Sequence, residues 1–151
     1  MGTVLVAAVV ADQVTKAIAI ETLSSGAVHI GPLHLRLVAN RGTFMGILAL
    51  PTWLLTSLTL GIVAVAARNG WRTGASPIGY ALLIGGALGN LIDRYLQRPD
   101  FPSHAVVDWL SFGGTTFNLA DVFIVATVLL LVGDGSREAA PMPQADAVAR
   151  E

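Results

Sequence analysis

The stretch TGASPIGYALLIGGALGNLI, residues 73–92, contains no charged side chain and decides the fold class. A helix over these residues is long enough to cross a hydrocarbon core of roughly 30 Å. A second uncharged stretch, residues 42–67, is longer still. Of the 151 residues, 54% are hydrophobic and only 13% are charged, which is about half the charged fraction of an ordinary soluble domain. The sequence therefore predicts an all-α membrane protein.

Two further apolar segments carry isolated charges and are predicted to cross the membrane as well. Residues 3–20 are apolar except around Asp12 and Lys16, and residues 119–132 are apolar except for Asp121. Because a charge inside a bilayer is costly, these side chains are expected to face a protein partner or a watery cavity. We therefore predict four transmembrane helices, at residues 3–20, 45–67, 77–95 and 118–133.

The predicted helices delimit one domain and a tail. Residues 1–133 are expected to form a single four-span domain. Residues 134–151 are rich in alanine and proline and carry mixed charges. This composition is typical of a polar, disordered C-terminal tail.

The connections between the helices predict a small sheet at one membrane surface. In the first connection, Leu33, Leu35 and Leu37 alternate with polar residues, which is the pattern of a half-buried strand. In the third connection, residues 105–109 supply another strand, and Gly113-Gly114 marks a turn. Since successive connections alternate between the two sides of the membrane, these strands are expected to share one face.

Composition excludes several classes of function. The formal net charge is -1, and there is no basic patch of the kind that nucleic-acid binding requires. The chain has no cysteine, so it has neither disulfides nor a thiolate nucleophile or metal ligand. The three histidines, at positions 29, 34 and 104, lack metal-ligand spacing. No metal site and no cofactor are predicted.

Polar residues from every part of the chain are expected to gather near one face of the bilayer. The alternating directions of the four spans bring together Asp12, Lys16, Asn40, Asn90, Asp93, Arg94, Asn118 and Asp121, and Asp108 belongs to a connection on the same side. Intramembrane ionisable groups are candidates for a functional site. The opposite half of the predicted spans carries no ionisable residue.

Most of these residues also have a purely structural interpretation. Asp12 and Lys16 are four residues apart, so an ion pair within one helix would neutralise both. Asp93 is followed directly by Arg94 and lies three residues after Asn90, an arrangement that favours a clamp between spans. Helix capping or the bonding of loop backbone accounts for Asn40 and Asn118 equally well.

Asp108 and Asp121 are less easily explained as structural. Asp108 lies in the apolar segment VVDWL without a neighbouring cation, so burial is expected to raise its pKa. Asp121 lies in the first turn of the last helix, where the helix dipole favours the ionised carboxylate. A carboxyl that keeps its proton beside one that loses it suits water activation. Helix capping, metal binding and ion translocation remain alternatives for this pair.

Four separated blocks of the sequence closely resemble the lipoprotein signal peptidase family, also called signal peptidase II. The blocks occur in the family's order, and in combination they are highly specific. They are DQVTK at 12–16, NRG at 40–42, GGALGNLIDR at 85–94, and VVD at 106–108 together with FNLAD at 117–121. The resemblance implies four transmembrane helices with an extracytoplasmic β-cradle.

This resemblance implies an aspartic endopeptidase of the bacterial inner membrane, with its active site near the extracytoplasmic face. Such an enzyme removes the signal peptide from a diacylglyceryl-modified prolipoprotein, just before the lipidated cysteine. Asp108 and Asp121 would be its catalytic pair. Substrate-binding or supporting roles fall to Asn40, Gly42, Asn90, Asp93, Arg94, Asn118 and Ala120, and an architectural role to Asp12 and Lys16.

The implied partners are a lipid-modified prolipoprotein and membrane lipid, and the protein is expected to act as a monomer.

Three alternatives to this interpretation remain. Asp93 could replace Asp108 in the pair, although the adjacent Arg94 is expected to hold Asp93 ionised. The second is a small proton-coupled transporter, which requires a polar path through the whole bilayer. The third is a scaffold that binds precursors without cleaving them.

Overall fold

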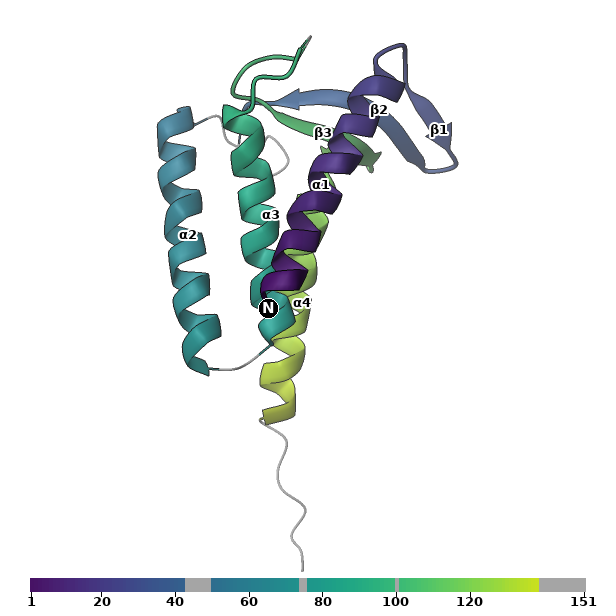
Figure 1. Ribbon diagram of the computed structural model, residues 1–151. Coiled ribbons are helices and arrows are strands. Elements are labelled where there is room, and N and C mark those ends of the chain that lie inside the picture. Colours follow the sequence, from purple (N-terminus) through teal and green to yellow (C-terminus); the bar gives the residue numbers. More distant parts are fainter. Residues whose placement is uncertain (43–49, 74–75, 100, 139–151) are drawn as a thin grey trace, which may run out of the picture.

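The computed structural model describes residues 1–42, 50–73, 76–99 and 101–138 (Figure 1). Within them it has four helices and one sheet. The helices are α1 (Gly2–Leu23), α2 (Thr52–Thr73), α3 (Pro77–Tyr95) and α4 (Leu119–Glu138). The strands are β1 (Val28–Ile30), β2 (Leu33–Asn40), β3 (Val106–Phe112) and β4 (Thr115–Phe117). The sheet lies across one end of the helix bundle, at the top of Figure 1.

Helix α3 is the centre of the bundle and packs against the other three helices. Glycines permit this close packing. A Cβ atom added at Gly86 would lie 2.6 Å from the carbonyl oxygen of Ala120 in α4, and one at Gly89 would collide with the Asp12 carboxylate in α1. Small residues of this kind let helix backbones approach closely within membranes. The motif around residues 85–94 is therefore also a packing motif.

The distribution of side chains suits a lipid environment. On α1, Val6, Val10, Val14 and Ile18 follow one another at four-residue intervals, and each is between 51% and 59% exposed. On the same helix, Asp12 and Lys16 are completely buried. A soluble protein rarely exposes so continuous an apolar surface.

Two of the described helical segments are long and apolar enough to cross a membrane, Gly2–Leu23 and Thr52–Gly70. The apolar part of α4, Leu119–Leu131, is shorter. The four predicted helices are thus present as helices, and two of them also have the length and hydropathy of a span.

The bounds of three helices differ from the prediction. The first was expected at residues 3–20, and α1 ends only at Leu23. The second was expected at residues 45–67, of which 45–49 lie outside the described residues, and α2 is Thr52–Thr73. Proline suits a helix start because it has no N–H to leave unpaired, and the carbonyl of Pro51 accepts the first hydrogen bonds, from Leu54 and Leu55. The last helix runs to Glu138, beyond the predicted end at residue 133. Residues 139–151 of the predicted tail lie outside the described residues.

The sheet is antiparallel, with strand order β1-β2-β3-β4. The predicted turn at Gly113-Gly114 joins β3 to β4, and both glycines have positive φ, +57° and +85°, as the tight hairpin requires. The predicted alternation in β2 is also present, since Leu33, Leu35 and Leu37 are half-buried. The alternation breaks at a bulge between Leu35 and Val38, which brings Val38 opposite Asp108.

Candidate active site

Asp108 lies in β3 and is held by two asparagine amides. Its Oδ1 accepts a hydrogen bond from Asn118 Nδ2 at 2.6 Å, and its Oδ2 accepts one from Asn40 Nδ2 at 2.9 Å. The carboxyl is 1% exposed. Burial raises the pKa of Asp108 to about 7, and the nearby charge of Asp121 adds to this rise, while the two amides oppose it. The predicted direction of this pKa is confirmed, and its main cause is the loss of hydration.

Asp121 lies in the first turn of α4 and forms a capping box with Asn118. The side chain of Asn118 accepts a hydrogen bond from the Asp121 backbone N–H at 3.1 Å, and the Asp121 carboxylate accepts one from the Asn118 N–H at 3.3 Å. Such reciprocal bonds satisfy N–H groups that a helix start leaves free. Asn118 thus caps a helix and also binds Asp108. Asp121 further accepts a bond from Asn90 Nδ2 at 3.0 Å.

Both aspartates line one small cavity, here called the aspartate cavity. Its volume is about 20 Å³, and this size accommodates roughly one water molecule. The lining consists of Asn40, Asn90, Arg94, Val106, Asp108, Asn118 and Asp121. The arrangement therefore provides two carboxyl groups around a space for a single water, with a guanidinium beside them.

The three asparagines around this cavity share one arrangement. In each, the side-chain oxygen is occupied by a donor, so that the amide nitrogen faces an aspartate. The oxygen of Asn40 accepts from the Gly42 N–H at 2.8 Å, that of Asn90 from Lys16 Nζ at 2.9 Å, and that of Asn118 from the Asp121 N–H. Each aspartate is consequently held by a neutral donor with a fixed orientation.

Arg94 braces the segment that carries Asn40. Its Nη1 donates to the Asn90 carbonyl at 2.9 Å and its Nη2 to the Gly42 carbonyl at 3.0 Å. Arg94 is 7% exposed, and its Nε is buried without a hydrogen-bond partner among the residues that the structure describes. Arg94 itself lines the aspartate cavity.

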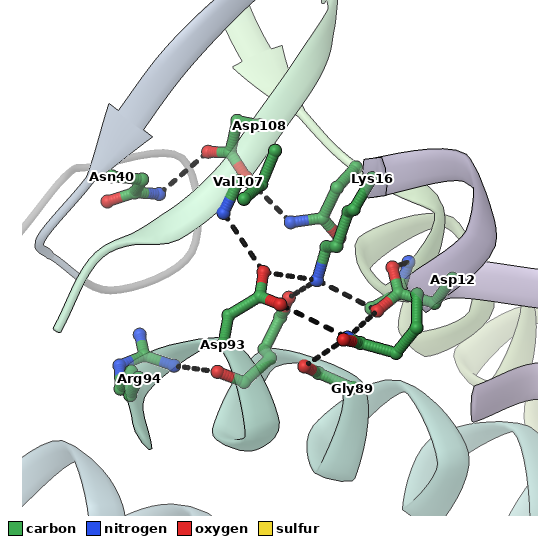
Figure 2. Close-up of polar contacts among 12 residues, drawn as sticks. Asp12, Lys16, Asn40, Gly89, Asp93, Arg94, Val107 and Asp108 are labelled. Carbon is green, nitrogen blue, oxygen red and sulfur yellow. Dashed lines mark hydrogen bonds and ion pairs between the residues drawn. The ribbon is translucent and has the colours of Figure 1, made fainter. Parts of the chain in front are cut away.

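Beneath this cavity, Lys16 lies between the carboxylates of Asp12 and Asp93, as Figure 2 shows. Its Nζ is 2.8 Å from Asp12 Oδ2 and 2.9 Å from Asp93 Oδ2, and all three side chains are fully buried. Arg98 and Gln13 extend the arrangement through bonds to Asp93 Oδ1 at 2.9 Å and 3.1 Å. These five residues are called the Lys16 cluster below. The predicted pairing of Asp12 with Lys16 is confirmed.

The Lys16 cluster touches both aspartate-bearing segments. Asp93 Oδ2 accepts a hydrogen bond from the Val107 N–H at 3.0 Å, next to Asp108 (Figure 2). Asp12 Oδ1 accepts one from the Ala120 N–H at 3.0 Å, next to Asp121. Ala120 thus contributes through its backbone. Through Asn90, the ammonium of Lys16 is also linked to the Asp121 carboxylate.

One expectation about this region was wrong in its detail. Arg94 was expected to be the cation that holds Asp93 ionised, but the cations bonded to Asp93 are Lys16 and Arg98. The reason is helix geometry, because consecutive residues point in different directions around a helix. Asp93 is held by two cations and does not line the aspartate cavity. It is therefore a poor substitute for Asp108 in a catalytic pair.

The sequence did not predict three groups in this region. Two are side chains of the Lys16 cluster, and the third is a backbone N–H that bonds to it. Gln13 bonds Asp93, the Gly89 carbonyl and Arg98, and its place between Asp12 and Lys16 was the available signal. Arg98 follows the end of α3, and nothing in its local sequence indicated a buried role. The Val107 N–H gives no signal in a sequence at all, since it is backbone.

A larger apolar groove of about 460 Å³ leads to the site from the helices. Its walls come from α2, α3 and α4, with Leu55, Leu58, Ile62, Leu83, Ile124 and Val128 among them. The groove reaches Asn90, Arg94 and Asp121. An apolar chain lying in it would therefore have its end beside one of the two aspartates.

Among the described residues, no group of three or more His, Cys, Asp or Glu is suited to a metal ion.

Comparison with known proteins identifies the family. The profile described as signal peptidase (SPase) II matches residues 4–136. The chain belongs to the signal peptidase II family. A lipoprotein signal peptidase of Rhodococcus jostii is 41% identical over 128 residues, which cover 80% of this chain and 64% of that protein. One from Bifidobacterium longum subsp. infantis is 37% identical over 134 residues, covering 85% of this chain and 74% of that protein.

A solved structure has the same fold. It is described as a bacterial membrane enzyme, shares 25% sequence identity, and superposes with a TM-score of 0.80 over 97% of this chain and 95% of its own.

Membership of the signal peptidase II family supports a membrane protease that removes signal peptides from prolipoproteins. It gives no support to the proton-coupled transporter.

Proposed function

We propose that this member of the signal peptidase II family is an aspartic endopeptidase whose catalytic pair is Asp108 and Asp121. Its substrate is a diacylglyceryl-modified prolipoprotein, which it cuts just before the lipidated cysteine. The observation that carries the proposal is the aspartate cavity, where two carboxyl groups line a space of about 20 Å³. Aspartic catalysis needs this combination of two carboxyls and one water.

The surroundings suggest how the work divides between the two carboxyl groups. Asp108, with its pKa raised to about 7, holds a proton near neutral pH and donates it to the scissile carbonyl oxygen. Asp121 lies at a helix start and accepts two hydrogen bonds, so it acts as the base. It takes a proton from the attacking water, whose oxygen bonds to the carbonyl carbon.

The resulting gem-diol collapses when the amide nitrogen receives the proton that Asp121 took up and the C–N bond breaks. The proton that Asp108 gave to the carbonyl oxygen returns to it. No covalent intermediate with the enzyme forms, and the two carboxyls end as they began. Because they share a proton, they titrate as a unit.

The apolar groove matches the apolar part of this substrate. Its lining is mostly aliphatic, and it ends at Asn90, Arg94 and Asp121. A signal peptide or acyl chain in the groove would bring the peptide bond beside Asp121. The Nε donor of Arg94, buried without a partner among the described residues, would then meet a substrate carbonyl.

The proposal includes a placement in the cell. All four helices would cross the bacterial inner membrane, and the sheet with the catalytic pair would lie near the extracytoplasmic face. The exposed apolar side chains of α1, α2 and α4 support contact with lipid on several sides. The protein would act as a monomer. It would need no cofactor, since both proton transfers use its own carboxyl groups.

The test is cleavage by the purified protein of a lipidated prolipoprotein and of its unlipidated form, followed by mass spectrometry. Cleavage of the lipidated form alone, just before the cysteine, is expected. Asp108→Asn and Asp121→Asn should each abolish it, while Glu21→Gln, which neutralises an exposed carboxylate on α1, should not. Full activity of Asp108→Asn would refute the assignment of the pair.

A further inference from the structure

A second groove reaches the aspartate cavity from the sheet. It has a volume of about 400 Å³ and is lined by residues of β2, the segment after it and the β3–β4 hairpin, including Arg36, Asn40, Arg41, Asp108 and Thr116. We call it the polar groove. The apolar groove ends at Asp121, whereas the polar groove ends at Asp108. A peptide that crosses the catalytic pair from the apolar groove therefore continues into the polar one.

Arg36 is placed in the polar groove by an irregularity of the sheet. Leu35 pairs with Leu110 and Val38 with Asp108, so two residues of β2 lie opposite the single residue Trp109. A bulge of this type changes the direction of a side chain and often occurs next to an active site. The bulge contains Arg36, two residues before the partner of Asp108.

The guanidinium of Arg36 is held in place from across the sheet. Its Nε and Nη2 donate to Thr116 Oγ1 at 3.2 Å and 2.9 Å, although β3 lies between the two strands. Thr116 is buried and donates in turn to Ser111 Oγ at 3.2 Å. A guanidinium has five N–H donors. Thr116 therefore orders the group and leaves donors for a further acceptor.

The charges lining this groove favour an anionic ligand. Arg36 and Arg41 supply two permanent positive charges, and among the described residues of the lining the only carboxyl is that of Asp108. A planar guanidinium pairs well with a carboxylate because two parallel N–H···O bonds form. Arg36 is exposed, so the ligand reaches it from water rather than from lipid. This combination suits the hydrophilic part of a substrate.

We propose that Arg36 is a specificity-determining residue that binds an acidic side chain of the prolipoprotein, shortly after the cleavage point. The inference rests on the proposed function, because it takes the scissile bond to lie at Asp108. Val38 is opposite Asp108 and Arg36 lies two residues away along β2. At about 3.3 Å per extended residue, the acidic side chain belongs roughly two to four residues after the cut.

The test compares lipidated substrates that differ at one position. Substrates with aspartate or asparagine at the second, third or fourth residue after the cut are cleaved by the purified full-length protein. At one of these positions, kcat/KM should be about three- to tenfold higher for aspartate. Arg36→Gln should remove this preference by lowering kcat/KM for the aspartate substrate to that for the asparagine substrate, and Arg36→Glu should reverse the preference.

A matched control is Arg68→Gln, which removes an exposed arginine of α2 outside the groove and should keep the full preference. A preference that survives in Arg36→Gln, or is missing in the unchanged protein at all three positions, overturns the assignment. So does a result in which Arg36→Gln alters only the dependence on anionic phospholipid in the micelle. That outcome would assign the groove to a lipid headgroup.

Binding separates this inference from the proposed function. In Asp121→Asn, which keeps the polar groove, the dissociation constants of the aspartate and asparagine substrates should differ by the same factor, and Arg36→Gln should make them equal. If no substrate is cleaved but this difference in binding persists, the peptidase proposal fails and the groove assignment stands. Equal binding in Asp121→Asn contradicts the groove assignment even where cleavage is observed.

Discussion

The Lys16 cluster and the aspartate cavity hold carboxylates in opposite ways at the same end of the bundle. In the cluster, Asp12 and Asp93 both bond directly to the ammonium of Lys16, and Asp93 also bonds to Arg98. In the cavity, the donors to Asp108 and Asp121 are asparagine amides and a backbone N–H. Among the described residues, no ion pair reaches either of these two.

This difference suits the two pairs of carboxylates to the different roles proposed for them. A cation in direct contact fixes a carboxylate in its ionised form, so Asp12 and Asp93 are suited to holding helices together. A neutral amide fixes the position of a carboxyl and still allows it to carry a proton. The same residue type is therefore held by cations in one place and by neutral donors in the other, as the proposed division into architecture and proton transfer requires.

The largest effect is expected from exchanging a reactive carboxyl for an amide. Asp108→Asn and Asp121→Asn should each lower kcat by at least about 10²–10⁴-fold, the contribution of a general acid or base. The melting temperature in detergent should fall less than on loss of Lys16, since the amide gives up one accepted hydrogen bond but leaves no buried charge without its partner. A marked loss of thermal stability together with residual activity would reverse the comparison.

Removing the central cation should affect folding. Lys16→Met leaves two buried carboxylates without their shared partner, which is expected to cost about 3–5 kcal/mol of unfolding free energy. Thermal or denaturant unfolding in micelles measures this loss. Arg98→Met is the matched variant, and its loss should be smaller because Asp93 keeps its bonds to Lys16 and Val107. Equal losses would contradict the central role of Lys16.

Asn90 joins the two regions, since it accepts from Lys16 and donates to Asp121. Asn90→Ala removes both of these hydrogen bonds to charged groups, and loss of the one to Asp121 should lower kcat about 10- to 100-fold. KM and the melting temperature should change little. Asn69→Ala, at an exposed position towards the other end of α2, is the control. An effect confined to KM would show that Asn90 binds substrate instead of positioning Asp121.

The smallest effect is expected in the pH profile. The catalytic pair needs one proton, so activity should decline as the pH rises past about 7, where Asp108 ionises. Asn40→Ala removes a donor that stabilises ionised Asp108, so the pKa rises and the alkaline limb moves upward, by about half a unit to one unit. Glu21→Gln should leave the limb in place. A shift toward lower pH would contradict this assignment.

Much of the fold followed from hydropathy and chain direction. The charge-free stretches predicted helices, the alternating leucines predicted β2, and the alternation of spans predicted that Asp108 and Asp121 share one end. The helix bounds near Pro51 and after residue 133 were less well predicted, because apolar composition does not specify where a helix starts or ends.

The site was predictable in its members and less so in its contacts. The sequence motifs singled out both aspartates and the three asparagines. The partners of Asp93 were not predictable, because neighbours in sequence diverge around a helix and Arg98 reaches back from a later segment. The orientation of Asn90 depends on a donor from another helix, Lys16, and no local pattern encodes that. The donors to Asn40 and Asn118 lie close by in sequence, at Gly42 and Asp121.

The capping box of α4 has a consequence for the order in which the protein is made. Synthesis proceeds from the N-terminus, and Asn40, Asn90 and Asp108 precede Asn118 and Asp121 in the chain. A ribosome-bound chain that ends before Asn118 lacks one of the two carboxyls and the shortest hydrogen bond to the other. The residues that begin the last helix are also the ones that complete the proposed pair, so under this proposal a partly synthesised chain carries no complete hydrolytic centre.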